Sequence, residues 1–190
     1  MLISKCLTWL NDLPWLNIFQ ELNSAPEQLP ILLKSYGIEA SSLAPLLVAT
    51  NSDLEPYGRN IVFKNDKIEV MLASWAAKAI SSPHNHGSSC GLIWFVEGDF
   101  TEQHYSFNGR DLVKHGEVQK YFENSVVQVQ QSDIHSCGPS TVGVSLHIYS
   151  PPIHGMKIWD TLGKRTLTVA DECGAWIPKE EKLIIDQKAW

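Results

Sequence analysis

The spacing of apolar residues divides the chain into two parts. Up to about residue 50 they recur at the spacing of one helix face, and we expect helices over residues 6–22, 24–37 and 42–48. Pro14 marks a break or a start within the first of them. The second opens on Ser24-Ala-Pro-Glu27, which has the form of a capping box. These helices are expected to cover a core rather than to carry the function.

After residue 51 apolar and polar residues alternate almost to the end, as is typical of strands with one buried face. Residues that favour turns, such as Asn65-Asp66 and Gly138-Pro139, separate the alternating stretches. Many short strands behind a helical preface predict a mostly β protein, a double-sheet jelly roll or small β-barrel. The predicted strands are residues 59–64, 67–75, 91–97, 101–107, 112–121, 126–130, 144–149, 156–159 and 166–170.

Length and composition are those of an ordinary globular domain. The chain has 190 residues, of which 44% are hydrophobic and 19% charged. We expect a single domain over 1–190, with a helical preface at 1–50, a small β-barrel at 55–171 and a tail at 172–190 that the pattern does not define. A net charge of -6 with scattered Lys and Arg argues against a nucleic-acid partner.

The cellular context follows from cysteines and hydropathy. The four cysteines lie far apart, which suits a reducing compartment better than a disulfide framework. No run reaches the ~18 apolar residues of a membrane span, and Asn11, Asp12 and Pro14 interrupt the apolar N-terminal stretch. We therefore expect a cytoplasmic protein without membrane association. The sequence leaves the oligomeric state open, and a monomer is favoured.

The segment His84-Asn85-His86 leads into the apolar run 92–96. In an extended chain residues i and i+2 share a face, so His84 and His86 are able to direct two imidazoles at one metal ion. Imidazole is a common ligand of the mid and late first-row metals. Two exposed loop histidines are the alternative, and the choice depends on what else the chain brings near the pair.

The strand at residues 144–149 is the second informative segment. Period two places Ser145, His147 and Tyr149 on one face and apolar residues on the other. A solvent-exposed face is one interpretation. A row of Ser, His and Tyr offers donors and acceptors that relay to one another, which favours a polar row lining a cavity.

His135 is the best candidate for a third ligand, because it follows a predicted strand and precedes a turn. His104 and His115 lie in outer-strand or hairpin sequence and are interpreted as surface residues. His154 lies in a Pro-rich turn and is expected to be exposed.

An ordered set of motifs over roughly residues 55–165 resembles the thiol dioxygenases of the cupin superfamily, specifically type I cysteine dioxygenase. The set is far more specific than His-x-His alone. It consists of Tyr57-Gly-Arg59-Asn60, Trp75 ahead of His84-x-His86, His135, and Ser145-x-His147-x-Tyr149-Ser150-Pro151-Pro152.

The resemblance implies that His84, His86 and His135 hold Fe(II). L-Cysteine would bind through its thiolate and amine, with O2 at the remaining position, and both oxygen atoms would go to sulfur to give cysteine sulfinic acid. No organic cofactor is implied. Arg59 would bind the substrate carboxylate with its guanidinium fork, with Tyr57 as a second carboxylate partner.

Further roles follow from the same resemblance. Tyr149 would donate its hydroxyl near the substrate carboxylate and oxygen, with His147 and Ser145 behind it as a relay. Trp75 would pack beside the site. The Ser150–Pro151 peptide bond would be cis, as in the family.

Two departures concern position 91. Most cupins have a carboxylate ligand where this chain has Gly91, and its loss leaves three neutral imidazoles, so a bound ferrous ion keeps its full charge and favours a thiolate. Animal members of the family carry a cysteine at this position that forms a thioether with the tyrosine. Cys90 is one residue away and would face the opposite side of the sheet. We predict no crosslink and a free phenol at Tyr149.

Three alternatives stay open. Related enzymes that act on mercapto acids without an amine generally have Gln in the role of Arg59, so Arg59 favours cysteine over a thiol such as 3-mercaptopropionate. A closed all-His zinc site would need a fourth ligand that the sequence does not show. A non-catalytic metal-binding cupin is the candidate from another functional class.

Overall fold

The structure is a computed structural model that describes residues 10–22, 24–50 and 55–190. Its N-terminal part is helical, as predicted, with different boundaries. The first predicted helix begins outside the described residues, and α2 (Trp15–Leu22) starts directly after Pro14. The others are a 3-10 helix at Pro26–Gln28, α3 (Leu29–Ser35), α4 (Ala40–Leu43) and a 3-10 helix at Ala44–Leu46.

The predicted capping box at Ser24 is wrong. Ala25 is the residue before the Pro26–Gln28 turn, and no side-chain hydrogen bond caps that turn. The corresponding contact occurs at α4, where Ser42 Oγ accepts a hydrogen bond from the Glu39 backbone N–H at 2.9 Å. Gly37 ends the second helical segment as predicted, with a φ of 78° that favours glycine.

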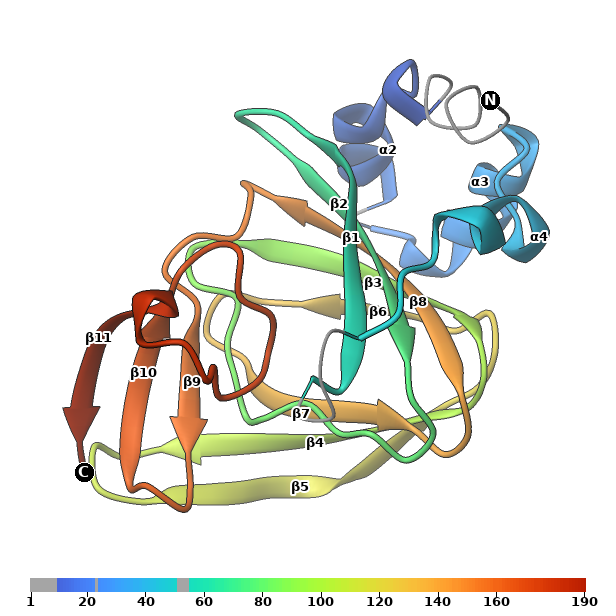
Figure 1. The fold of residues 1–190 in the computed structure, drawn as a ribbon. Coiled ribbons are helices and arrows are strands. Elements are labelled where there is room, and N and C mark those ends of the chain that lie inside the picture. The colour runs from blue at the N-terminus through green and yellow to red at the C-terminus, as the bar shows by residue number, and fades with distance from the viewer. Residues whose placement is uncertain (1–9, 23, 51–54) are drawn as a thin grey trace.

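Within the described residues all pairs of named strands are antiparallel, in one five-stranded sheet and two three-stranded sheets. The five-stranded sheet has the order β1-β2-β8-β3-β6 and the smaller ones the orders β5-β4-β7 and β11-β10-β9 (Figure 1). The strands are β1 (Tyr57–Lys64), β2 (Glu69–Trp75), β3 (Cys90–Glu97), β4 (Phe100–Phe107), β5 (Leu112–Tyr121), β6 (Val126–Val129), β7 (Ile134–Pro139), β8 (Gly143–Ser150), β9 (Lys157–Asp160), β10 (Arg165–Val169) and β11 (Ile184–Ala189).

Two of these strands were not predicted. His135 was expected between a strand and a turn, but it lies within β7, which pairs with β4. Gly138-Pro139, interpreted as a turn, forms the end of this strand. The tail left undefined by the sequence contributes β11, which pairs with β10.

Residues 81–86 join the two three-stranded sheets into one layer. The His84 backbone bridges both to His135 of β7 and to Ile158 of β9. Its N–H donates to the His135 carbonyl at 2.9 Å, and the His135 N–H donates to the His84 carbonyl at 3.0 Å. The segment that carries two of the candidate ligands is therefore the seam between two sheets.

The helices cover one face of the five-stranded sheet (Figure 1). Trp15, Leu33 and Leu43 pack in one core with Leu146 and Ile148 of β8. A second core lies on the other face and joins side chains of the five-stranded sheet to β4 and β7. Every helix within residues 10–22, 24–50 and 55–190 is too short or too polar to cross a membrane.

Candidate metal centre and cavity

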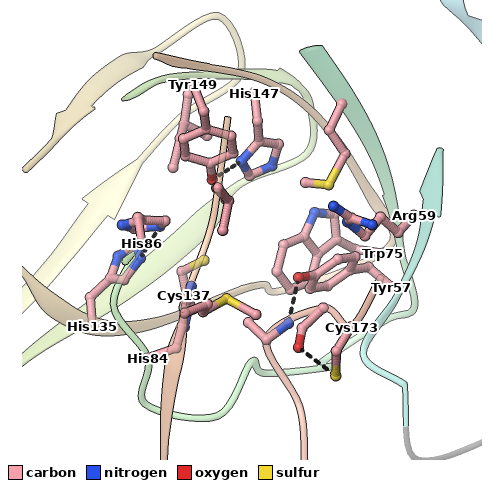
Figure 2. Close-up of a pocket in the computed structure, with 16 residues that line it drawn as sticks. Tyr57, Arg59, Trp75, His84, His86, His135, Cys137, His147, Tyr149 and Cys173 are labelled. Atoms are coloured by element: carbon pink, nitrogen blue, oxygen red, sulfur yellow. Dashed lines mark hydrogen bonds between the residues drawn. The ribbon is translucent and has the colours of Figure 1, made fainter. Parts of the chain in front are cut away.

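His84, His86 and His135 come together in the second core. One nitrogen atom from each lies within 4.8 Å of the others, and the three residues are between 1% and 6% exposed. His84 and His86 come from the seam and His135 from β7 (Figure 2). The sequence prediction that these three imidazoles converge is confirmed.

The hydrogen-bond partners of two of the rings leave Nε2 as the ligand atom. His84 Nδ1 lies 2.8 Å from the Ser82 carbonyl, which only accepts, so Nδ1 carries the proton. His135 Nδ1 is likewise hydrogen-bonded to the carboxylate of Glu102. His135 Nε2 lies 3.3 Å from His86 Nε2, a separation that fits two imidazoles sharing one ion at ~2.0–2.1 Å. The residues present therefore fit a metal ion.

Burial keeps the His84 and His86 rings neutral. Burial, together with the neighbouring His135, lowers the pKa of His84 to about 3 and that of His86 well below its usual value. A neutral imidazole has the lone pair that a metal ligand needs.

A cavity of about 30 Å³ adjoins the three histidines. Both layers contribute to its wall. A bound ion would have open positions on this side, unlike the closed zinc site considered from the sequence. Further residues that line it are Tyr57, Arg59, Met71, Trp75, Ile93, Cys137, His147, Tyr149, Ile153, Met156, Cys173, Gly174 and Ala175.

His147 and Tyr149, on the polar face of β8, line this cavity (Figure 2). With Ser145 and Trp75 they form a continuous relay. Trp75 Nε1 donates to Ser145 Oγ at 2.8 Å. Since the indole N–H only donates, the Ser145 hydroxyl is left to donate to His147 Nε2, 2.7 Å away. Burial lowers the pKa of His147 to about 3, so the neutral ring has its proton on Nδ1 and donates it to the Tyr149 hydroxyl at 2.9 Å.

This direction of the relay leaves the Tyr149 proton free for the cavity. Burial raises the pKa of Tyr149 well above its usual value, so the phenol stays protonated. Trp75, expected only to pack beside the site, is the first donor of the relay. The prediction of a buried polar row instead of a solvent-exposed face is confirmed, since Ser145, His147 and Tyr149 are at most 5% exposed.

Gly91 makes room for the Tyr149 ring. It pairs with Tyr149 across β3 and β8, and a Cβ at this position would lie 2.5 Å from a ring carbon. Cys90 pairs with Ser150 and its sulfur lies 3.6 Å from Gln130, so it faces away from the tyrosine, as predicted. The Ser150–Pro151 peptide bond is cis, as the resemblance implied.

Arg59 lies at the cavity, but it has an ion-pair partner that the sequence analysis missed. Its Nη2 donates to Glu69 Oε1 at 2.9 Å, and Lys64 Nζ lies 2.7 Å from the other carboxylate oxygen. Glu69 is fully buried. A charged residue within the apolar stretch 68–72 was the signal that could have found it, because a buried carboxylate requires a partner.

Tyr57 lies beside Arg59 on the same strand, as the spacing predicted, and its ring packs on Trp75 at 4.3 Å between centroids. Its hydroxyl accepts a hydrogen bond from the Ala175 backbone N–H at 2.9 Å. Burial raises the pKa of Tyr57, so the hydroxyl keeps its own proton to donate. The tail, which the sequence left undefined, thus closes one side of the cavity with residues 173–175.

The remaining histidines divide differently from the prediction. His115 and His154 are exposed, as expected. His104 was expected at the surface, but its side chain is only 34% exposed and its Nε2 lies 3.3 Å from Glu102 Oε2. Its inward direction follows from its register opposite His135 in the β4–β7 pair.

Comparisons with known proteins agree with this geometry. A family model described as cysteine dioxygenase type I matches residues 15–162. A curated cysteine dioxygenase type 1 from Danio rerio is 26% identical over 151 residues, which covers 75% of this chain and 74% of the relative.

Similarity to solved structures concerns the fold alone. A Klebsiella pneumoniae protein with a double-stranded β-helix domain has a TM-score of 0.50 at 12% identity, over 61% of this chain and 87% of its own. A cupin superfamily protein from Desulfitobacterium hafniense has a TM-score of 0.45 at 13% identity, over 56% and 84% of the two chains.

Proposed function

Because the chain belongs to the cysteine dioxygenase type I family of the cupin superfamily, we propose that it is an Fe(II)-dependent thiol dioxygenase acting on L-cysteine. Both atoms of O2 would be added to the substrate sulfur, giving cysteine sulfinic acid. The observation that carries the proposal is the convergence of three buried histidines on one side of a cavity that also presents Arg59 and Tyr149.

In this proposal His84, His86 and His135 hold the ion. Bound Fe(II) would supply the redox chemistry that lets O2 react with a thiol. An imidazole binds a metal ion only in its neutral form, so three histidine ligands would leave the charge of the ion to favour the thiolate form of the substrate. In two of the three rings a hydrogen bond from Nδ1 leaves Nε2 as the ligand atom. His84 donates to the Ser82 carbonyl and His135 to the Glu102 carboxylate.

Arg59 and Tyr57 would bind the substrate carboxylate. Arg59 uses one nitrogen for Glu69, which holds the guanidinium in place and leaves other N–H groups for the cavity. Tyr57 keeps a hydroxyl proton to donate, since its oxygen accepts from Ala175. A charge-assisted hydrogen bond of this kind contributes ~1.5–3 kcal/mol.

Tyr149 would direct its hydroxyl proton at the bound substrate or O2. His147 donates to its oxygen, and Ser145 and Trp75 fix the His147 ring in turn. A donor held by three successive hydrogen bonds loses little conformational freedom when the substrate arrives. The buried site also excludes water from the thiol.

The test is O2 consumption by the Fe(II)-loaded protein with L-cysteine and, separately, with 3-mercaptopropionate, with the sulfinic acid product identified by mass. We expect faster turnover of cysteine. A clear preference for 3-mercaptopropionate would contradict the substrate assignment and keep the chemistry. No O2 consumption with any thiol would favour a non-catalytic metal-binding cupin.

We also propose, from the sequence, that the chain forms one domain and that the protein is monomeric and cytoplasmic.

A further inference from the structure

Glu102 is a buried carboxylate at the third candidate ligand. It lies on β4, is 4% exposed, and pairs with Cys137 of β7 next to His135. Phe100 and Glu102 are both buried and Thr101 between them is partly exposed, so alternation turns the carboxylate inward. A buried carboxylate in a β-sheet needs a specific set of partners, and this one has three.

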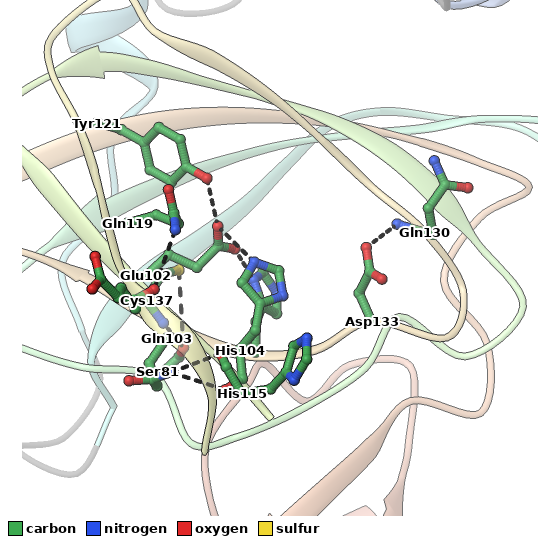
Figure 3. A network of polar contacts seen from close by, with 12 residues as sticks. Ser81, Glu102, Gln103, His104, His115, Gln119, Tyr121, Gln130, Asp133 and Cys137 are labelled. Carbon is green, nitrogen blue, oxygen red and sulfur yellow. Dashed lines mark hydrogen bonds and ion pairs between the residues drawn. The ribbon is translucent and has the colours of Figure 1, made fainter. Parts of the chain in front are cut away.

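The partners of Glu102 are arranged around both oxygen atoms. Oε1 accepts a hydrogen bond from His135 Nδ1. Oε2 accepts from the Tyr121 hydroxyl at 2.9 Å and lies 3.3 Å from His104 Nε2. Figure 3 shows the carboxylate between Tyr121 on one side and His104 on the other. Its orientation is thus fixed from β5 and from its own strand.

The three candidate ligands have unequal support behind them. His135 donates to a carboxylate and His84 to the Ser82 carbonyl. His86 Nδ1 has no hydrogen-bond partner in the described part of the chain. A carboxylate behind an imidazole fixes its tautomer and increases its basicity more than a neutral carbonyl does. His135 is therefore the ring whose donor strength the protein controls most directly.

We propose that Glu102 is a positioning residue for the metal centre, acting through His135. It holds the His135 ring with Nε2 toward the ion. It also supplies a negative charge that is separated from the ion by the His135 ring. Most cupins place a carboxylate directly on the ion, at the position of Gly91 in this chain. Here the carboxylate would lie behind a ligand instead, which leaves that coordination position free for substrate. The inference rests on the proposed metal site.

The test measures Co²⁺ binding to the metal-free full-length protein, by competition with a chromophoric chelator and by visible absorption, which reports the ligand geometry. Glu102→Ala removes both the hydrogen bond and the charge, and we expect a ~10–100-fold loss of Co²⁺ affinity with a changed spectrum. Glu102→Gln keeps an amide oxygen for His135 Nδ1–H but removes the charge, so a smaller loss with a nearly unchanged spectrum is expected. Tyr121→Phe keeps the carboxylate and should cause the smallest loss.

Glu117→Gln is the matched control, because it makes the same chemical change at an exposed position on β5. The inference is overturned if Glu102→Gln and Tyr121→Phe bind Co²⁺ within twofold of the unchanged protein, or if Glu117→Gln loses as much affinity. Glu102→Gln and Tyr121→Phe still test the inference if Glu102→Ala does not fold. Co²⁺ binding needs neither thiol nor O2, so a protein that oxidises no thiol but shows this ranking would refute the proposed function alone.

Discussion

The two faces of β8 are equally buried, but one carries apolar side chains and the other polar ones. Val144, Leu146 and Ile148 face the helices and lie in an apolar core. On the opposite face Ser145 and His147 are buried with Tyr149 in a hydrogen-bonded relay at the cavity. Burying polar groups costs free energy unless each one finds a partner. One strand therefore contributes stability through one face and a preset donor through the other.

The largest effect is expected for a change on the cavity side that removes a metal ligand. His86→Ala should abolish retention of Fe(II), because only two imidazoles are left to bind the ion and one more coordination position is open to solvent. Elemental analysis after loading and desalting measures this. His154→Ala, at an exposed histidine, is the control and should keep its metal. Unchanged metal content in the His86 variant would contradict the ligand assignment.

The helix side of β8 is tested by Leu146→Ala. Leu146 is fully buried among apolar residues, so the truncation should lower the free energy of unfolding by ~2–5 kcal/mol. Denaturant unfolding measures the loss. Metal content and KM of the folded protein should be unchanged, and a shift in KM would show that the two faces are coupled.

The role of Arg59 is tested in a variant in which its ion-pair partner, Glu69, has been replaced by uncharged Gln. Arg59→Ala by itself would leave buried Glu69 with only Lys64, so the double variant Arg59→Gln/Glu69→Gln is compared with Glu69→Gln. Loss of a ~1.5–3 kcal/mol contact should raise KM for cysteine about tenfold or more, with iron retained. Equal KM values in the two variants would exclude carboxylate binding by Arg59.

Ser145→Ala tests the relay. It leaves the Trp75 N–H and His147 Nε2 without their partner, which should cost ~1–3 kcal/mol of stability, less than Leu146→Ala. Because Tyr149 then loses its fixed orientation, kcat should fall while KM changes little. Steady-state kinetics separate the two. A fall in stability with unchanged kcat would reduce the relay to a structural role.

Lowering the pH should lower the free energy of unfolding through His147, which lies on the cavity side of β8. Burial lowers its pKa to about 3, whereas histidine in an unfolded chain titrates near 6.5. Between these values the unfolded state binds more protons, so stability falls by ~1.4 kcal/mol per pH unit for such a group as pH decreases, and is constant above 6.5. Thermal unfolding of the metal-free protein from pH 5 to 8 measures this slope. His147→Asn should reduce it and His154→Asn should not.

The sequence predicted the faces of β8 well, because alternation is a local property. It placed Ser145, His147 and Tyr149 together without knowledge of the fold. The first donor of the relay comes from β2, and the partner of Trp75 could not be predicted because strand pairing between β2 and β8 decides it. Local pattern gives the direction of a side chain, and only topology gives its neighbour.

The strand β7 escaped prediction for a related reason. The stretch 132–139 is rich in residues that favour turns, and its extended form depends on pairing with β4 and with the His84 backbone. Glu69 and Glu102 were not predicted as part of the site, because the prediction of a metal centre rested on the spacing of histidines. Glu69 is a charged residue within an otherwise apolar strand, and Glu102 lies on the same period-two face as Phe100, so the sequence does contain a signal for each.

The seam at His84 and His135 determines how the chain tolerates change in length. Two of the proposed ligands come from distant parts of the polypeptide, and the same reciprocal pair of backbone hydrogen bonds that closes the layer sets their register. An insertion in the β4–β5 hairpin adds residues far from that pair and should be accommodated. A single added residue between Ser81 and His84 would shift the register of the seam, so the imidazoles would separate although every ligand is still present in the sequence.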